Sequence, residues 1–158
     1  QDIALVYITH NETGTGILNP IREIGALAHA YGAIFVVDTT STYAMRPINI
    51  KNDNIDFCMA SAQKGLMAMT GISFVVGKRT IIEQSKTYPK RSYYCNLYMQ
   101  YHYFEAHGEM HFTPPVQTVY AMRRLKNTLR RANKKNGSVI PECLRLCTRG
   151  LNGWDFRI

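Results

Sequence analysis

Three short apolar runs most constrain how this chain of 158 residues can fold. They cover residues 2–9, 33–37 and 55–60, and polar residues follow each of them. Near-continuous apolar runs of this length are typical of strands that are covered on both faces. Between the first two runs, Pro20 opens a stretch in which apolar residues recur at helical spacing, and Gly32 ends it. The order strand, helix, strand predicts a parallel crossover unit, and therefore an α/β fold with a mostly parallel sheet and flanking helices.

Smaller elements are expected around the third run. Residues 72–77 form a fourth apolar run, and the 11 residues before it leave no room for a full crossover helix. We therefore predict that this fourth strand is antiparallel to its neighbour. The alternating residues 48–50 indicate a short edge strand, and residues 80–85 predict a short helix with Thr80 as its N-cap.

Two further helices are predicted in the second half of the chain. The tyrosine-rich segment 88–104 carries a stripe at helical spacing, which we interpret as core packing. The stripe consists of Tyr94, Leu97, Tyr98, Tyr101 and Phe104. After a rigid turn at residues 112–115, residues 116–131 predict a helix. Its inward positions are expected to be Val116, Val119, Tyr120 and Leu125.

An aspartate and a lysine follow two of the predicted strands, 26 residues apart, as Asp38 and Lys64. Ligands of parallel α/β sheets bind outside the carboxyl ends of the strands, so both side chains are expected at one pocket. An aspartate that pairs with a protonated pyridine nitrogen and a lysine that forms an imine are the minimal equipment for holding pyridoxal phosphate. Taken alone, Lys64 is more simply a surface lysine, and Asp38 could be a helix cap.

Neutral hydrogen-bond donors near the pair strengthen this interpretation. A cofactor phosphate can be held by hydroxyls, amides and backbone N–H groups. Ser61 and Gln63 are suitable donors beside Lys64, and Thr13 is suitable for the oxygen on the cofactor ring. His10 leads the loop that carries Thr13, and it is a candidate for a residue just behind the site.

The net charge of +8 does not belong to the predicted fold. Residues 1–121 carry nine basic and nine acidic side chains, whereas residues 122–158 carry ten basic and two acidic ones. This basic tail lacks the interleaved aromatic residues of a nucleic-acid stacking platform, so nucleic acid is not expected as a partner. A non-catalytic basic module that binds through the tail remains the competing class of function.

Cysteine use and hydropathy indicate the setting of the protein. The four cysteines and five histidines show no spacing of a metal site, and we expect free thiols in a cytoplasmic protein. No apolar run approaches the roughly 20 residues of a membrane helix, and no signal peptide is visible, so no membrane association is expected. The sequence does not begin with Met, which raises the possibility of a fragment.

Four segments in a fixed order resemble the class V aminotransferases of pyridoxal-phosphate fold type I. They are residues 10–20 (HNETGTGILNP), 37–41 (VDTTS), 61–64 (SAQK) and 112–114 (FTP). The resemblance covers about residues 2–130 and is specific as an ordered combination. It implies part of the large domain of that fold in residues 1–131, followed by an atypical basic tail in residues 132–158.

The resemblance implies a role for each candidate residue. Lys64 is the Schiff-base lysine, and its freed amine shuttles the proton between substrate and cofactor. Asp38 keeps the pyridine nitrogen protonated, and Thr13 binds the ring oxygen. Thr40 lies against a face of the ring, where the family commonly has an apolar residue, so Thr40 is a departure.

Three more residues concern the cofactor phosphate. The resemblance implies that Ser61 and Gln63 bind it within one subunit. Thr113 matches a residue that reaches the phosphate of the neighbouring subunit's cofactor, which implies a homodimer. Cysteine desulfurases usually have a histidine at the position of Gln63, so that branch of the family is less favoured.

Within the family, the resemblance is greatest to enzymes that move an amino group from 2-aminoethylphosphonate to pyruvate. The implied partners are therefore a small amino donor and an oxo acid. An alanine–glyoxylate type of transaminase is the nearest alternative, and a catalytically inactive truncated product is another. Complete enzymes of the family are more than twice this length, so this chain alone is expected to have little or no activity.

Overall fold

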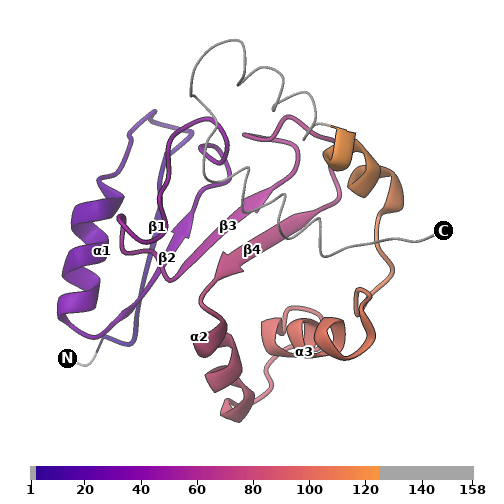
Figure 1. Ribbon diagram of the computed structural model, residues 1–158. Helices are drawn as coiled ribbons and strands as arrows, with labels where there is room; N and C mark the ends of the chain where they lie inside the picture. Colours follow the sequence, from indigo (N-terminus) through magenta and orange to yellow (C-terminus); the bar gives the residue numbers. More distant parts are fainter. Residues whose placement is uncertain (1–2, 125–158) are drawn as a thin grey trace.

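The computed structural model describes residues 3–124 and shows an α/β arrangement of four strands with helices around them (Figure 1). In chain order, the elements are β1 (Leu5–Thr9), α1 (Ile21–Ala30), β2 (Ile34–Asp38), β3 (Phe57–Ser61), β4 (Ser73–Gly77), α2 (Arg79–Gln84), the 3₁₀ turn η1 (Ser85–Thr87) and α3 (Leu97–His107). Residues 116–124 are also helical.

The strands form one sheet in the order β1-β2-β3-β4. The first three strands are parallel, with Thr9 opposite Asp38 and Asp38 opposite Met59. β4 pairs with β3 in the antiparallel direction, so Ser61 lies opposite Ser73. The predicted α/β fold with a mostly parallel sheet is confirmed, and so is the antiparallel fourth strand.

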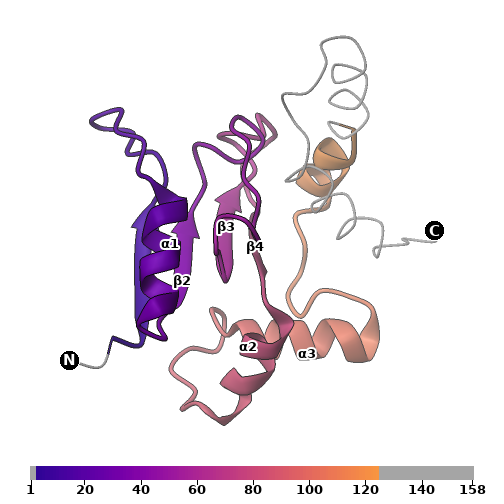
Figure 2. The ribbon, with the colours of Figure 1, turned by 60° about the vertical axis from the view of Figure 1, so that its left-hand side comes forward.

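Helix α1 covers one face of the sheet, as Figure 2 shows for the part formed by β1 and β2. The strand residues on this face are buried: Phe35, Val37, Cys58 and Ala60 are each at most 3 % exposed. Gly25 of α1 makes the close packing possible, because a Cβ there would lie 2.6 Å from the Asp53 carbonyl oxygen and 3.0 Å from the Phe35 ring. Phe35 and Val37, and likewise Cys58 and Ala60, are two residues apart in their strands, so each pair shares this core-facing side.

The other face of the sheet carries apolar side chains that the described residues cover only in part. Leu5 and Tyr7 on β1 are about half exposed, and Val75 on β4 is 38 % exposed. Val36 and Phe57, in the middle strands, are buried. Asp38 lies on this face because it is two residues beyond Val36.

Two local predictions are wrong for reasons of hydrogen bonding. Helix α2 begins at Arg79 after Lys78, not at a Thr80 cap, because the Lys78 N–H is bound to the Asp56 carbonyl oxygen at 3.0 Å. Residues 48–50 form no strand, because the backbone turns there. The Asn49 N–H donates to the Asp53 carboxylate at 2.8 Å, and this turn chemistry overrides the apolar alternation.

The core assignments of the two late helices are also wrong. Helix α3 has no buried residue, so its tyrosine stripe is not core. It packs instead at the surface beside α2, where the Tyr101 hydroxyl donates to Glu83 at 3.1 Å. In residues 116–124, the buried positions are Thr118 and Met122, whereas Val116 and Tyr120 are nearly half exposed. Leu125, the rest of the helix predicted to residue 131, and residues 132–158 lie outside the described residues.

Residues 3–124 contain neither a membrane-spanning helix nor a metal-binding cluster. No helix in this part of the chain is both long and apolar enough to cross a membrane. No group of three or more histidine, cysteine, aspartate or glutamate side chains could hold a metal ion there.

Candidate active site

The loops that follow β1, β2 and β3 leave the sheet at one edge, the upper edge in Figure 1. This edge is the carboxyl end of the three parallel strands, where α/β proteins bind ligands. The loops are residues 10–19, 39–46 and 62–72. Six of the seven candidate residues lie in these loops or at the strand ends beside them.

The first loop, residues 10–19, is closed at its base by backbone hydrogen bonds and carries Thr13 near its tip. Its base is fixed by a hydrogen bond of 2.8 Å from the Asn19 N–H to the His10 carbonyl oxygen, and by a bridge between Asn11 and Leu18. The Thr13 hydroxyl lies 3.2 Å from the Ser41 hydroxyl. The loop after β1 is thus joined at its tip to the loop after β2.

The Asp38 carboxylate is held by two donors at the end of β2. The Thr40 N–H donates to Oδ1 at 2.8 Å, and the Tyr7 hydroxyl donates to Oδ2 at 3.2 Å. Burial and the charge of Asp38 both raise the pKa of Tyr7, so the phenol stays neutral and remains a donor. A carboxylate accepts about four hydrogen bonds, so Asp38 keeps capacity for a ligand N–H.

The second loop forms a tight turn over the end of β3. Thr39 donates from its N–H and from its hydroxyl to the Met59 carbonyl oxygen, both at 2.9 Å. The N–H groups of Thr42 and Tyr43 donate back to the Thr39 carbonyl oxygen. Tyr43 is 1 % exposed and packs edge-on against Phe74, with ring centroids 5.0 Å apart. The turn is therefore anchored in the core.

Lys64 combines a fixed backbone with an open side chain. The neighbouring Gly65 N–H donates to the Thr40 carbonyl oxygen at 3.2 Å, and the Met67 N–H donates to the Lys64 carbonyl oxygen at 2.8 Å. A Cβ at Gly65 would overlap the Tyr43 carbonyl oxygen, so only glycine fits there. The Lys64 side chain is exposed and makes no hydrogen bond or ion pair within residues 3–124.

The remaining candidates divide into two groups. Ser61 ends β3 half-buried, and Gln63 is exposed beside Lys64 in the chain. Thr113 is exposed, and the segment after it packs against the loop that follows β3, since Thr118 donates to the Thr70 carbonyl oxygen at 2.8 Å. No contact among the described residues joins Thr113 to the other candidates.

Three contributors to this edge were missed by sequence reasoning, namely Tyr7, Ser41 and Gly65. Tyr7 carries a weak signal, because it alternates with Thr9 on β1 and so shares a face with Asp38. Ser41 belongs to the strand-end segment 37–41 that carries the resemblance, but no role of its own was predicted for it. Gly65 follows the lysine directly, and a glycine beside a reactive group indicates a close approach of backbone.

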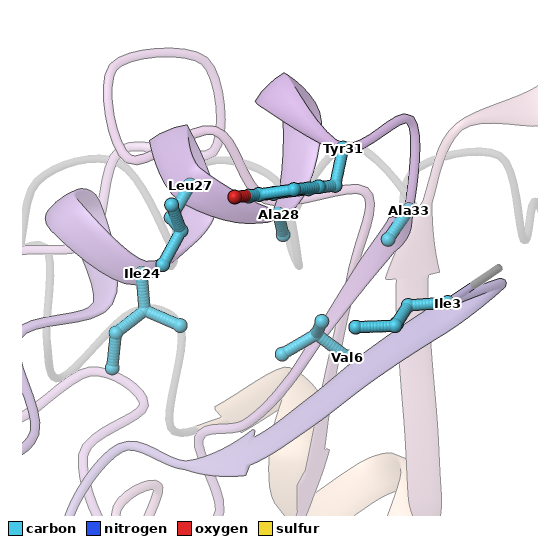
Figure 3. A pocket seen from close by; sticks show the side chains of 7 residues that line it. All are labelled: Ile3, Val6, Ile24, Leu27, Ala28, Tyr31 and Ala33. Carbon is cyan, nitrogen blue, oxygen red and sulfur yellow. The ribbon is translucent and has the colours of Figure 1, made fainter. Parts of the chain in front are cut away.

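A cavity of about 160 Å³ lies away from these residues, between α1 and β1 (Figure 3). Its lining is apolar apart from one phenol, and consists of Ile3, Val6, Ile24, Leu27, Ala28, Tyr31 and Ala33. Ile3 and Val6 belong to the amino-terminal part of the β1 segment, whereas the candidate residues follow its carboxyl end. Among its lining side chains, Tyr31 alone carries a polar group.

The strand-end residues fit pyridoxal phosphate in chemical type. Asp38 is an oriented carboxylate with free accepting capacity, and Lys64 is an amine without a competing ion pair among residues 3–124. Thr13, Ser61 and Gln63 supply the neutral donors that a phosphate and a ring oxygen need. The shared hydroxyl contact of Thr13 and Ser41 leaves lone pairs and one proton for a ligand.

Comparisons with known proteins give a consistent result. The family model described as aminotransferase class-V matches residues 1–137. The 2-aminoethylphosphonate–pyruvate transaminase of Lysinibacillus sphaericus is 37 % identical over 122 residues, which cover 77 % of this chain and 33 % of that protein. The enzyme of the same name from Salmonella typhimurium is 38 % identical over 120 residues, covering 75 % and 32 %. The chain thus spans about a third of the length of these curated relatives.

Solved structures show the same fold. Pyridoxamine–pyruvate aminotransferase from Mesorhizobium loti matches 84 % of this chain and 34 % of its own, with a TM-score of 0.73 and 22 % identity. Alanine–glyoxylate aminotransferase from Nostoc sp. matches 94 % and 38 %, with a TM-score of 0.68 and 24 % identity. At these identities the likeness establishes only the fold, which is part of that of pyridoxal-phosphate transferases.

Proposed function

We propose, since the chain belongs to the class V aminotransferase family, that it is the cofactor-holding part of a transaminase. The observation that supports this most is the meeting of three strand-end loops at one edge, with Asp38 and Lys64 on two of them. Pyridoxal phosphate, joined through its aldehyde carbon to an amine, supplies an electron sink for the carbon that loses a proton.

Lys64 and Asp38 would have distinct tasks in this site. The Lys64 amine would bind the cofactor covalently, and after release by the substrate it would carry the proton at Nζ. The exposed and unpaired state of the amine within the described residues supports this role. Asp38 would keep a proton on the pyridine nitrogen, and its two donors from Tyr7 and Thr40 would fix its direction.

Four further residues would hold and orient the cofactor. Thr13 would donate to the ring oxygen, and Ser61 and Gln63 would bind the phosphate. Thr40 would lie against a face of the ring, with its methyl group in place of the apolar residue common in the family. Thr40 is half-buried, and its carbonyl oxygen accepts from Gly65, so its backbone lies close to that of Lys64.

We also propose 2-aminoethylphosphonate and pyruvate as the substrate pair of the whole protein. The support is identity of 37–38 % to two transaminases of that name over about three-quarters of this chain. An alanine–glyoxylate pair is the nearest alternative. The matched segment makes up only a third of those relatives, so substrate selection also depends on residues outside it.

The assembly of the whole protein is a further part of the proposal. We propose a cytoplasmic homodimer in which Thr113 reaches the cofactor phosphate of the neighbouring subunit. The exposure of Thr113 and the lack of a contact with the other candidates within residues 3–124 are consistent with a role across an interface. Light scattering of the purified protein is expected to give the mass of a dimer, and a strictly monomeric protein contradicts the proposal.

A segment exchange tests the catalytic assignment. Residues 3–124 of this chain replace the matching segment of the Salmonella typhimurium transaminase, and amino transfer from 2-aminoethylphosphonate to pyruvate is measured. Transfer is expected to persist and to vanish with Lys64→Arg, whereas the control Lys51→Arg retains it. A folded, cofactor-binding chimera without transfer contradicts the proposal. Steady-state turnover by the 158-residue chain alone is expected to be little or none.

A further inference from the structure

His10 lies at a junction between two of the strand-end loops. It occupies the position immediately after β1, and its side chain is buried, with 6 % of the residue exposed. Its backbone N–H donates to the Asp38 carbonyl oxygen at 2.9 Å, and its Nδ1 lies 2.9 Å from the Thr42 hydroxyl oxygen. One buried residue therefore contacts the end of β2 through its backbone and the following turn through its imidazole.

The Thr42 hydroxyl has two partners, the Thr39 carbonyl oxygen and His10 Nδ1. Thr42 is 4 % exposed, and its hydroxyl oxygen lies 3.4 Å from the Thr39 carbonyl oxygen. A threonine hydroxyl has one proton, and when that proton goes to the Thr39 carbonyl oxygen, the hydroxyl oxygen accepts from His10 Nδ1. When the proton goes to Nδ1 instead, the same two atoms are joined with the roles reversed. Burial lowers the pKa of His10, and the charge of Arg46 adds to this while Asp53 opposes it, so the neutral form is favoured.

The turn that Thr42 anchors is packed directly against the residue after Lys64. The Tyr43 carbonyl group occupies the space that a Cβ of Gly65 would need. The Thr40 carbonyl oxygen accepts the Gly65 N–H at 3.2 Å. Ala44 adopts a positive φ of 65°, which shows that the turn is held in a conformation that alanine rarely adopts. A shift of this turn would move the backbone on which Lys64 is carried.

We infer that His10 is a positioning residue: through Thr42 it holds residues 39–46 against Gly65 and thereby sets the distance between Asp38 and Lys64. The role of this contact in cofactor binding rests on the proposed function. The contact of residues 39–46 with Gly65 does not depend on a bound cofactor. His10 itself touches neither Asp38's carboxylate nor Lys64, and it acts through the Thr42 hydroxyl. The required chemistry is one hydrogen bond between the side chain at position 10 and a hydroxyl at position 42.

Matched substitutions separate this role from general stability. Thr42→Val removes the hydroxyl at nearly constant shape, and Thr42→Ser retains it. His10→Leu removes the hydrogen-bond partner of Thr42, and His10→Asn offers an amide group in a similar place. The readout is amide hydrogen exchange of the cofactor-free 158-residue chain at two positions. One is the Gly65 N–H beside the turn, and the other is the Phe35 N–H, which is bound to Asp56 at 2.7 Å.

We expect Thr42→Val and His10→Leu to raise exchange of the Gly65 amide about fivefold, the effect of losing roughly one hydrogen bond. Exchange of the Phe35 amide is expected to stay within about twofold, because it reports on the fold as a whole. Thr42→Ser and His10→Asn are expected to leave both amides near their original rates. An equal rise at both amides, or no rise at Gly65, overturns the inference.

A second readout links the inference to the cofactor. After incubation with pyridoxal phosphate and reduction with borohydride, the share of label on Lys64 is expected to fall about fivefold in Thr42→Val and to recover in Thr42→Ser. Undiminished labelling of Lys64 in Thr42→Val overturns the positioning role. If the unsubstituted chain shows no labelling of Lys64 while Gly65 exchange responds as expected, the held turn stands and the proposed function fails.

Discussion

The two ends of the parallel strands treat their polar groups in opposite ways. Before β3, the Asp56 carboxylate is 4 % exposed and has three donors: the Phe35 N–H at 2.7 Å, His29 Nε2 at 2.9 Å and Lys78 Nζ. After β3, Lys64 is exposed and unpaired within the described residues. One end satisfies a buried charge fully, and the other leaves a charge available.

The hydrogen bonds and ion pairs of Asp56 connect four elements of the fold, namely α1, β2, β4 and α2. His29 belongs to α1, Phe35 to β2, and Lys78 joins β4 to α2. Burial by itself raises the pKa of the Asp56 carboxyl, but the donors from Lys78, Phe35 and His29 outweigh it and lower the pKa below its ordinary value. The ionised carboxylate is thus the form that the fold stabilises.

The contrast indicates that residues 3–124 can perform chemistry at the carboxyl end of the parallel strands. A satisfied buried group contributes stability but has no capacity left for a ligand. An amine that is open on a rigid backbone contributes little stability and can react. The prediction is that substitutions before β3 change stability most, whereas substitutions at the other end change stability less and also change Lys64 labelling or cofactor binding.

The largest effect is expected from Asp56→Ala. It leaves the buried Phe35 N–H without an acceptor and separates Lys78 and His29 from their shared partner, at a cost of about 3 kcal/mol in unfolding free energy. Urea unfolding measures this cost. Glu105→Gln is the control, because the exposed pair with Arg79 at 3.8 Å should contribute less than about 0.5 kcal/mol. Equal effects of the two substitutions would remove the basis of the comparison.

Gly65→Ala is expected to be the strongest stability change at the other end. The new Cβ would overlap the Tyr43 carbonyl oxygen, and the adjustment should cost about 2 kcal/mol and displace Lys64. Thermal unfolding and reductive labelling of Lys64 measure the two consequences. Gly14→Ala is the matched control in the first loop, since its Cβ would meet only Glu12 Oε1 at 3.9 Å. A stable Gly65→Ala protein with normal labelling contradicts the close contact.

A smaller effect is expected from Tyr7→Phe, which removes one donor from the Asp38 carboxylate. Tyr7 is half exposed, so the loss of stability should be about 0.5–1 kcal/mol. Asp38 becomes less well oriented, and the dissociation constant of pyridoxal phosphate should rise about threefold. Fluorescence titration with the cofactor tests this, with Tyr31→Phe as control for loss of a phenol. Unchanged affinity in Tyr7→Phe would mean that Thr40 alone orients Asp38.

Acid is expected to affect the two ends in separate ranges of pH. The fold lowers the pKa of His10 from its ordinary 6.5, so the stability it contributes is complete above that value and is lost as pH falls through the folded pKa. The pKa of Asp56 is lowered from 3.8, so its contribution is lost only in more acidic solution. Urea midpoints between pH 8 and 3 measure both steps. His10→Asn should remove the first step alone, and its persistence in that variant would assign it to another group.

The sequence was sufficient for the framework and less so for its details. Apolar runs and their spacing predicted the strands, the α1 crossover and the antiparallel β4, because burial fixes these features. The tyrosine stripe of α3 misled, since helical spacing does not reveal whether another layer covers the helix. Likewise, Thr80 looked like a cap, but the long-range contact of Lys78 with Asp56 determines where α2 begins.

The candidate site was foreseeable in its chemical types and not in its support. The strand-end positions of Asp38 and Lys64 follow from the order of strands, because parallel strands end at one edge. The donors that orient Asp38 and the contact between Tyr43 and Gly65 depend on how loops fold over one another. No local pattern in a single sequence reveals such contacts between residues far apart in the chain.

The most direct test of the central claim is the chemical mapping of Lys64. The 158-residue chain is incubated with pyridoxal phosphate, reduced with borohydride and digested, and the labelled lysines are identified by mass. We expect Lys64 to be labelled in preference to exposed lysines such as Lys51 and Lys86, and Asp38→Ala to remove this preference. A label spread evenly over the exposed lysines, with none concentrated on Lys64, would show that Lys64 is not the cofactor-binding lysine.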